Sequence, residues 1–168
     1  FPYTTLFRSG TTIGESIKSV LAQTYTDLEL IIVDDGSTDD SCSVIESIKD
    51  PRIKLYRLEQ NEHISHATNY GFQKVTGAYL ARIDSDDVWY PQKLEKQITF
   101  LKNNPEYKIC FAWIDLIDEY GNSINEQQKE LLGVFETTFQ GQSDCLHRFF
   151  FGGNCLSHPS VVMRTKLM

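Results

Sequence analysis

The chain has 168 residues, enough for one domain with a sizeable core, and its 40% hydrophobic and 23% charged residues are ordinary for a globular protein. Its net charge of −7, from 16 basic and 23 acidic side chains, argues against a general nucleic-acid-binding protein, because phosphate backbones are held by clustered Lys and Arg. No apolar run reaches the roughly 18 residues of a membrane-spanning helix, and no signal peptide is apparent. The 4 cysteines form no C-x-x-C pair and no zinc spacing, which favours reduced thiols in a cytoplasmic protein.

The first nine residues, FPYTTLFRS, show no helical period and lead directly into a helical pattern. They resemble, residue for residue, the in-frame translation of a common sequencing-adapter oligonucleotide. We therefore expect residues 1–9 to be a non-native segment and residues 10–168 to be a partial domain. This domain is expected to lack its first strand and to continue beyond Met168.

Apolar periodicity in the rest of the chain predicts helices that alternate with strands. Such an alternation implies βαβ units, a mainly parallel sheet and an α/β fold. The segment after residue 118 is less regular, with a turn at 119–125 and a polar stretch at 125–142. Helices are predicted at 13–22, 37–50 with Ser37 as N-cap, 65–75, 92–104 after Pro91, and 144–151; strands are predicted at 28–35, 52–58, 78–83, 108–118 and 160–164.

Carboxylates gather where two of the predicted strands end. Asp34 and Asp35 end the strand at 28–35, and Asp84, Asp86 and Asp87 follow the strand at 78–83. Ligands of open parallel sheets bind outside the carboxyl ends of the strands. If the two strands are neighbours, five carboxylates crowd one edge, and a divalent cation with a phosphate-bearing ligand would offset their repulsion. Hard oxygen ligands suit magnesium or manganese.

Plainer interpretations remain open for these residues. The DSDD segment, residues 84–87, could be a solvated acidic turn at the start of the next helix, where acids are favourable. An EF-hand calcium loop does not fit, because Val88 and Trp89 interrupt the required spacing. His63 and His66 could share a metal, but a surface helix start explains them better. No G-x-G-x-x-G follows a strand, which disfavours a dinucleotide-binding fold.

Three blocks, SVLAQTYTDLELIIVDDGSTDDS, ISHATNYGFQKVTGAYLARIDSDDVWYPQKLEKQITFLKNNPE and HPSVVMR, together resemble one known family. They are similar, in order and spacing, to family 2 of the inverting nucleotide-sugar glycosyltransferases, which have the GT-A fold. The resemblance covers roughly residues 13–168 and is greatest to bacterial enzymes of surface-polysaccharide synthesis. One departure is His63, which stands where relatives usually have glycine and implies a different path for that loop.

The resemblance implies roles for particular side chains. Asp34 and Asp35 would contact the base and ribose of the nucleotide. Asp84 and Asp86 would form the D-x-D motif, with Asp84 near the ribose and Asp86 on a metal that bridges the diphosphate. His158 could approach the diphosphate or the acceptor, or act structurally beside Pro159. The expected nucleotide-sugar-binding residues are Asp34, Asp35, Asn69, Arg82, Asp84 and Ser85, and the expected metal-binding residues are Asp86, Asp84 and, in support, Asp87.

By this resemblance the whole protein is a metal-dependent inverting glycosyltransferase that uses Mn²⁺ or Mg²⁺. Its donor is a nucleoside diphosphate sugar, with a UDP-sugar favoured, and its acceptor is a saccharide or a lipid-linked saccharide. The expected location is cytoplasmic, at the inner face of the membrane, where peripheral association is compatible with the sequence. The catalytic base is expected beyond Met168, so this chain alone is expected to be inactive. The alternatives are a nucleotidyltransferase and a non-catalytic nucleotide-sugar-binding module.

Overall fold

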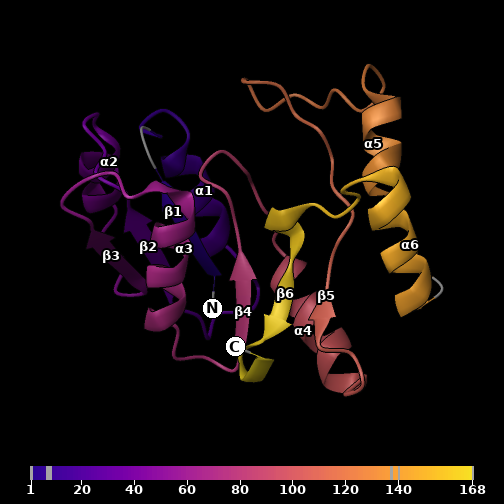
Figure 1. Ribbon diagram of the computed structural model, residues 1–168. Helices are drawn as coiled ribbons and strands as arrows, with labels where there is room; N and C mark the ends of the chain where they lie inside the picture. The colour runs from indigo at the N-terminus through magenta and orange to yellow at the C-terminus, as the bar shows by residue number, and fades with distance from the viewer. Residues whose placement is uncertain (1, 7–8, 137, 140, 168) are drawn as a thin grey trace.

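The centre of the fold is a six-stranded sheet with the order β3-β2-β1-β4-β6-β5 (Figure 1). The computed structural model describes residues 2–6, 9–136, 138–139 and 141–167. The first four strands along the chain are parallel, whereas β6 runs antiparallel to both of its neighbours, β4 and β5. This confirms the α/β fold with a mainly parallel sheet. The strands are β1 (Pro2–Leu6), β2 (Leu30–Asp34), β3 (Ile53–Arg57), β4 (Tyr79–Arg82), β5 (Ile109–Cys110) and β6 (Val162–Arg164).

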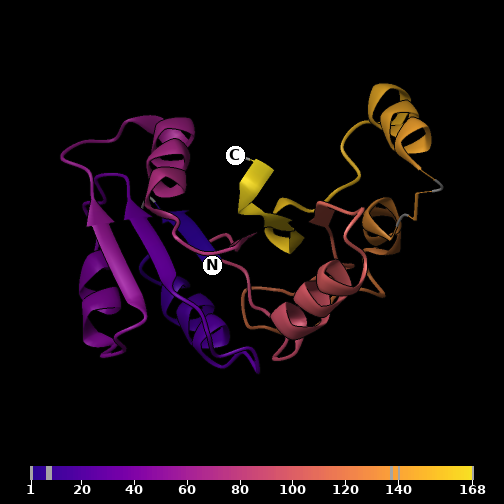
Figure 2. The same cartoon turned by 90° about the horizontal axis from the view of Figure 1, so that it is seen from below.

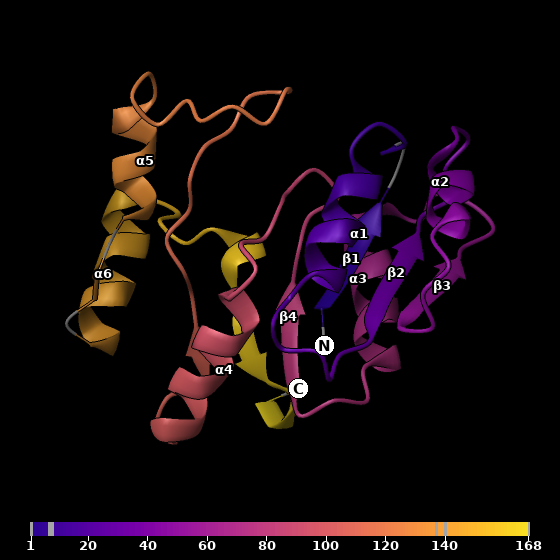
Figure 3. The same ribbon diagram turned by 180° about the vertical axis from the view of Figure 1, so that it is seen from behind.

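Three helices cover one face of the sheet: α1 (Ile13–Leu21), α2 (Ser41–Ser47) and α4 (Lys93–Asn103) (Figure 3). Each of them buries side chains at helical spacing, as the periodicity predicted. Together with the sheet they enclose the larger core cluster. Its helical members are Ile13, Ile17 and Val20 of α1, Ile45 of α2, and Leu94, Ile98 and Leu101 of α4.

Helix α3 (His63–Lys74) covers the opposite face over β1 and β2 (Figure 1). Its Ala67 packs in a second core cluster with Ile31, Val33 and Leu80. Strand β2 therefore lies between two helical layers, and all five of its residues are buried. This explains why its sequence is a continuous apolar run rather than an alternating one.

Two further helices, α5 (Lys129–Phe135) and α6 (Gln142–Gly152), stand apart from the sheet (Figure 2). Two short 3-10 helices, η1 (His158–Ser160) and η2 (Thr165–Leu167), flank β6. Among the described residues, no helix combines the length and the apolar character needed to cross a bilayer.

The expected absence of a first strand does not hold for this structure. Residues Pro2–Leu6 form β1, which pairs with β2 on one side and β4 on the other. Without β1, the facing edges of β2 and β4 would each carry a row of unpaired backbone N–H and C=O groups, which would destabilise the fold. Thr4 and Leu6 are 2% and 3% exposed, so their side chains fill the space under the helices. The non-native origin of residues 1–9 stays a prediction.

Three other elements differ from the sequence-based expectation. Helix α2 begins at Ser41 after an Asp40 N-cap, because the backbone N–H of Ser37 donates instead to Asp34 and residues 35–40 form a turn. Strand β5 has only two residues instead of the predicted 108–118, since β6 pairs only with Ile109 and Cys110. Helix α5 lies in the polar stretch for which no helix was predicted.

Candidate functional site

The two acidic clusters lie at the same edge of the sheet, although their strands are not adjacent. Asp34 is the last residue of β2, and Asp84 follows β4 by two positions. Strand β1 lies between these two parallel strands, so the condition that they are neighbours is not met. The carboxyl ends of parallel strands nevertheless point to one edge, and the two clusters are separated there by the width of one strand.

Both oxygens of Asp34 accept hydrogen bonds from the protein itself. The backbone N–H of Ser37 donates to Oδ1 at 3.2 Å, and the Cys42 thiol donates to Oδ2 at 3.2 Å. Asp34 is only 3% exposed. Burial and the neighbouring Asp34 carboxylate raise the pKa of the Cys42 thiol to about 11, so it remains protonated and able to donate.

Asp35 holds the turn after β2 against the start of α3. It is 4% exposed, and its Oδ1 accepts a 2.8 Å hydrogen bond from the backbone N–H of Glu62. Gly36, the next residue, has φ 72°, and a Cβ atom built on it would lie 2.8 Å from the backbone nitrogen of Asn61. Both the dihedral angle and the close approach therefore require glycine in this turn.

The DSDD segment contains carboxylates in three different environments. Asp84 forms an ion pair with Arg82, with 2.9 Å between Nη2 and Oδ1. Asp86 is exposed, and it has no hydrogen bond or ion pair within the described residues. Burial raises the pKa of Asp87 to about 6, with further contributions from the Asp84 and Asp86 charges. The hydroxyl of Ser85 lies 2.7 Å from that of Ser9.

These acids have the chemistry of a magnesium or manganese site, but they do not form one by themselves. Among the described residues, no group of three or more His, Cys, Asp or Glu side chains is arranged to hold a metal ion. Magnesium usually takes one or two protein carboxylates and completes its shell with water and substrate phosphates. The hard oxygen donors of residues 84–87 fit that mode of binding.

A polar hollow lies beside Arg82 and extends toward α3. It has a volume of about 410 Å³ and carries hydroxyl, amide, guanidinium and imidazole groups. Its lining residues are Ile64, Ser65, Thr68, Asn69, Arg82 and His158. The structure thus brings Asn69 and Arg82 together in one hollow with His158, Ser65 and Thr68. No motif distinguished Ser65 and Thr68, which become recognisable only because the fold places them in one hollow with Arg82 and His158.

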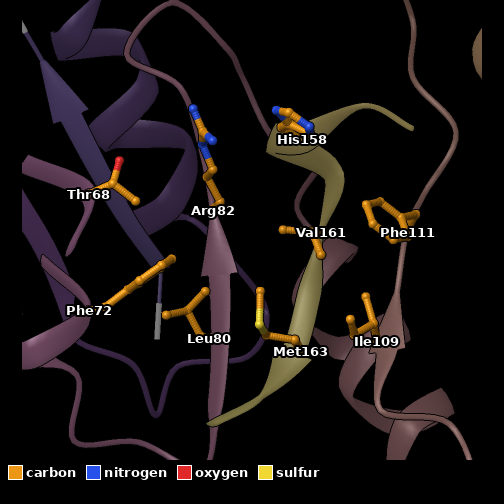
Figure 4. A pocket seen from close by; sticks show the side chains of 9 residues that line it. All are labelled: Thr68, Phe72, Leu80, Arg82, Ile109, Phe111, His158, Val161 and Met163. Carbon is orange, nitrogen blue, oxygen red and sulfur yellow. The ribbon is translucent and has the colours of Figure 1, made fainter. Parts of the chain in front are cut away.

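An apolar hollow of about 230 Å³ adjoins the polar one (Figure 4). The two share Thr68, Arg82 and His158, which lie along the upper rim of the apolar hollow in Figure 4. Its floor is the face of β4, β6 and β5 beside α3, and Thr68 and Phe72 of α3 line one side of it. The apolar lining residues are Phe72, Leu80, Ile109, Phe111, Val161 and Met163.

Several other sequence candidates have structural environments. His66 Nδ1 lies 2.7 Å from Oε2 of Glu62, and His63 and His66 belong to no metal-binding group within the described residues. Trp89 is 6% exposed, and its indole N–H donates to the carbonyl of Pro159 at 3.3 Å, so it packs in the larger core cluster beside η1.

The backbone at His63 has φ 69°, in the left-handed region that glycine adopts freely. It is the only described residue other than glycine with positive φ. The strain falls at the position where the resemblance expects glycine.

Comparison with known families gives a consistent result. The model of "Glycosyl transferase family 2" matches residues 4–165. The E. coli protein named UDP-Glc:alpha-D-GlcNAc-diphosphoundecaprenol beta-1,3-glucosyltransferase WfaP is 35% identical over 126 residues, which cover 75% of this chain and 46% of WfaP. The chain spans about half the length of the curated relatives it matches, with 41%, 52% and 48% for three of them.

Solved structures share the fold at lower identity. S. aureus TarS 1-349 in complex with UDP has a TM-score of 0.74 at 20% identity, covering 99% of this chain and 46% of TarS 1-349. The mannosyltransferase PcManGT from Pyrobaculum calidifontis, solved with GDP-Man and Mn2+, has a TM-score of 0.60 at 22% identity over 64% of this chain and 33% of PcManGT. With the α/β sheet and the family match over nearly all of its residues, the chain belongs to glycosyl transferase family 2 and has the GT-A fold.

Proposed function

We propose that this chain forms the nucleotide-sugar-binding part of a metal-dependent inverting glycosyltransferase. The whole protein would transfer a sugar from a nucleoside diphosphate sugar to a saccharide or lipid-linked acceptor. The observation that carries this proposal is the position of the two acidic clusters at one edge of the sheet, beside a hollow lined by Arg82 and His158. Family membership supports glycosyl transfer over the nucleotidyltransferase alternative.

The turn after β2 would hold the nucleoside. A carboxylate accepts hydrogen bonds only, and uracil presents an N–H group that it can bind. Asp34 and Asp35 are both assigned to the nucleoside. Both oxygens of Asp34 accept hydrogen bonds from the protein, whereas of the Asp35 oxygens only Oδ1 does so among the described residues. UDP is the favoured nucleotide because TarS has been solved with UDP and WfaP is named for UDP-Glc.

The DSDD segment would hold the divalent cation. Asp86 is the proposed direct ligand because its exposed carboxylate has no competing partner among the described residues. Oδ2 of Asp84 would lie near the ribose and the metal. Asp87 would support the metal site without contacting the metal directly. When bound, the cation supplies Lewis-acid stabilisation of the charge on the departing diphosphate. Mn²⁺ is a reasonable choice, since PcManGT was solved with it.

The polar hollow would receive the diphosphate and the sugar of the donor. Ser65, Thr68 and Asn69 can exchange hydrogen bonds with sugar hydroxyls. Arg82 and His158 can donate to phosphate oxygens, and the charge-assisted bonds of a guanidinium are among the stronger ones. Ser85, bonded to Ser9, is assigned to the same donor site through its place between Asp84 and Asp86.

The acceptor and the cellular location of the whole protein are part of the same proposal. WfaP is named for an acceptor that carries a diphosphoundecaprenol lipid. An acceptor of that kind would bring the enzyme to the cytoplasmic face of a membrane, where its donor nucleotide is available. An inverting transfer also needs a base for the acceptor hydroxyl, and the residues named here are assigned to binding rather than to that role.

Calorimetric titration of UDP into the 168-residue chain, with and without MnCl₂, tests the proposal. We expect binding that depends on manganese and that Asp86→Ala abolishes or weakens about tenfold or more, because one charge-assisted metal contact is lost. Glu119→Ala, which removes an exposed acid outside the two clusters, should leave binding unchanged. Binding that is independent of manganese, or equal in the parent and Asp86→Ala, would contradict the proposal.

A further inference from the structure

The turn after β2 is closed by a contact that the family assignment does not explain. The thiol of Cys42, in the first turn of α2, donates to Oδ2 of Asp34 at the end of β2. The other oxygen of the same carboxylate accepts from the backbone N–H of Ser37. The Asp34 side chain therefore connects the strand, the turn at 35–40 and the start of the helix.

The conformation of the backbone in this turn is restricted once both oxygens of the Asp34 carboxylate accept hydrogen bonds. The backbone carbonyl of Asp34 accepts from Leu58 N–H at 2.9 Å, which fixes the end of β2 against β3. Gly36 adopts φ 72°, and a Cβ atom at this position would lie 2.8 Å from the backbone nitrogen of Asn61. The turn carries Asp35, so the orientation of Asp35 depends on the same set of contacts.

We propose that Cys42 is a positioning residue for nucleotide binding, acting through Asp34 on the turn that carries Asp35. This inference rests on the proposed function, in which that turn holds the nucleoside. It requires the thiol to donate rather than accept. The raised pKa of this half-buried thiol agrees with the requirement, because the proton stays on sulfur at neutral pH.

Arg57 lies next to the contact between Cys42 and Asp34. It is the register partner of Asp34 on β3, and its Nη2 lies 2.7 Å from Oε1 of Glu46 on α2. The guanidinium also interacts favourably with the charged form of Cys42. Arg57 donates to Glu46 and not to Asp34, and among the described residues the Cys42 thiol is the side-chain donor to Asp34.

Three substitutions at Cys42 separate hydrogen bonding from packing. Cys42→Ser retains an O–H donor, Cys42→Val fills the space without a donor, and Cys42→Ala removes both the donor and the volume. We expect Cys42→Val and Cys42→Ala to raise the Kd for UDP, measured with MnCl₂, about fivefold, since one hydrogen bond to a carboxylate is lost. Cys42→Ser should stay within about twofold of the parent, because a hydroxyl is a good donor to a carboxylate.

Two controls make the result interpretable. Ser43→Ala changes the exposed neighbour in the same turn of α2, and Cys145→Ala removes a thiol on α6; both should bind UDP as the parent does. Urea denaturation of each variant measures how much of any change comes from loss of folded protein, and the Kd is calculated on the folded fraction.

The outcomes distinguish this inference from the proposal on which it rests. If the parent chain does not bind UDP, the proposed function fails and the inference fails with it. If the parent binds and Cys42→Val binds equally well, the inference alone is overturned. An affinity that follows side-chain volume, kept by Cys42→Val and lost in Cys42→Ser, would also overturn it.

Discussion

The guanidinium of Arg82 holds Asp84 through two N–H groups that meet the same carboxylate oxygen. Nε and Nη2 lie 3.0 Å and 2.9 Å from Oδ1. The contact joins the last residue of β4 to the first acid of the DSDD segment. It leaves Oδ2 of Asp84 available for a ligand, and it compensates part of the negative charge that Asp84, Asp86 and Asp87 share.

Replacing this guanidinium should weaken nucleotide binding. We expect Arg82→Gln to raise the Kd for UDP with MnCl₂ about tenfold, because hydrogen bonds to charged groups contribute about 1.5–3 kcal/mol. Arg82→Lys should recover only part of the affinity, since an ammonium group lacks the planar fork. Arg148→Gln, which breaks a 3.5 Å surface ion pair on α6, is the matched control. Equal affinities in the parent and Arg82→Gln would show that the ion pair has no part in binding.

The stability of the metal-free chain should depend on pH through Asp87. Burial raises the pKa of this carboxyl to about 6, above its value of about 3.9 in an unfolded chain. The folded state therefore binds the proton more tightly, so this group favours folding below about pH 4 and the contribution is lost as the pH rises through about 6.

Asp87→Asn should remove that dependence. In EDTA at pH 8 we expect the free energy of unfolding to rise on the order of 1–2 kcal/mol, after allowance for solvent screening, because no charge is then buried. The difference between the variant and the parent should shrink toward pH 4. Urea denaturation at pH 4, 6 and 8 measures it, and a difference that is constant across this range would show that Asp87 titrates normally.

His63 should be a site where glycine stabilises the fold. A left-handed conformation costs an L-residue with a side chain roughly 1–2 kcal/mol, whereas glycine pays mainly in unfolded-chain entropy. His63 has φ 69°, so we expect His63→Gly to stabilise the chain by roughly 0.5 kcal/mol. His66→Gly, within the same helix, should destabilise it by about 1 kcal/mol. Thermal unfolding of both variants tests the prediction, which fails if His63→Gly lowers the midpoint as His66→Gly does.

Gln97 should be among the most sensitive polar positions in the core. It is 6% exposed, and its Nε2 donates to the carbonyls of Cys110 and Ser160 at 3.2 Å and 2.9 Å, which joins α4 to β5 and η1. We expect Gln97→Leu to destabilise the chain by about 2–4 kcal/mol, because one buried and one partly buried carbonyl lose their donor. Thr99→Ala on the exposed side of α4 is the control. A loss below about 0.5 kcal/mol, in the range of surface changes, would contradict the prediction.

Much of the fold could be predicted because helical and strand periods are local properties of the sequence. The apolar run of β2 and the helical spacing of Ile13, Ile17 and Val20 each identify an element without reference to the rest of the chain. The weak elements could not be predicted in this way. Helix α5 has apolar residues at helical spacing, Leu131, Val134 and Phe135, but buries none of its residues, so its apolar pattern does not place it against the sheet. Strand β5 ends at Cys110, the last residue that pairs with β6.

The candidate site also has a part that the sequence predicts and a part that it does not. Asp34, Asp35 and the DSDD acids are recognisable from the sequence because charged residues directly after buried apolar runs are conspicuous. The environment of each carboxylate is not recognisable in this way. Nothing local indicates that Cys42 donates to Asp34, that Arg82 holds Asp84, or that Asp87 is buried enough to raise its pKa.

The sequence by itself determined the α/β class, the two acidic clusters and the resemblance to family 2 glycosyltransferases, because each depends on the order and spacing of residues along the chain. Only the tertiary structure decided that β1 separates β2 from β4 and that α3 brings Ser65 and Thr68 to face Arg82 and His158. The physical reason is that strand order and helix placement follow from burying apolar faces against partners distant in sequence. The period of a segment shows which of its faces is buried, but it does not show which distant segment covers that face.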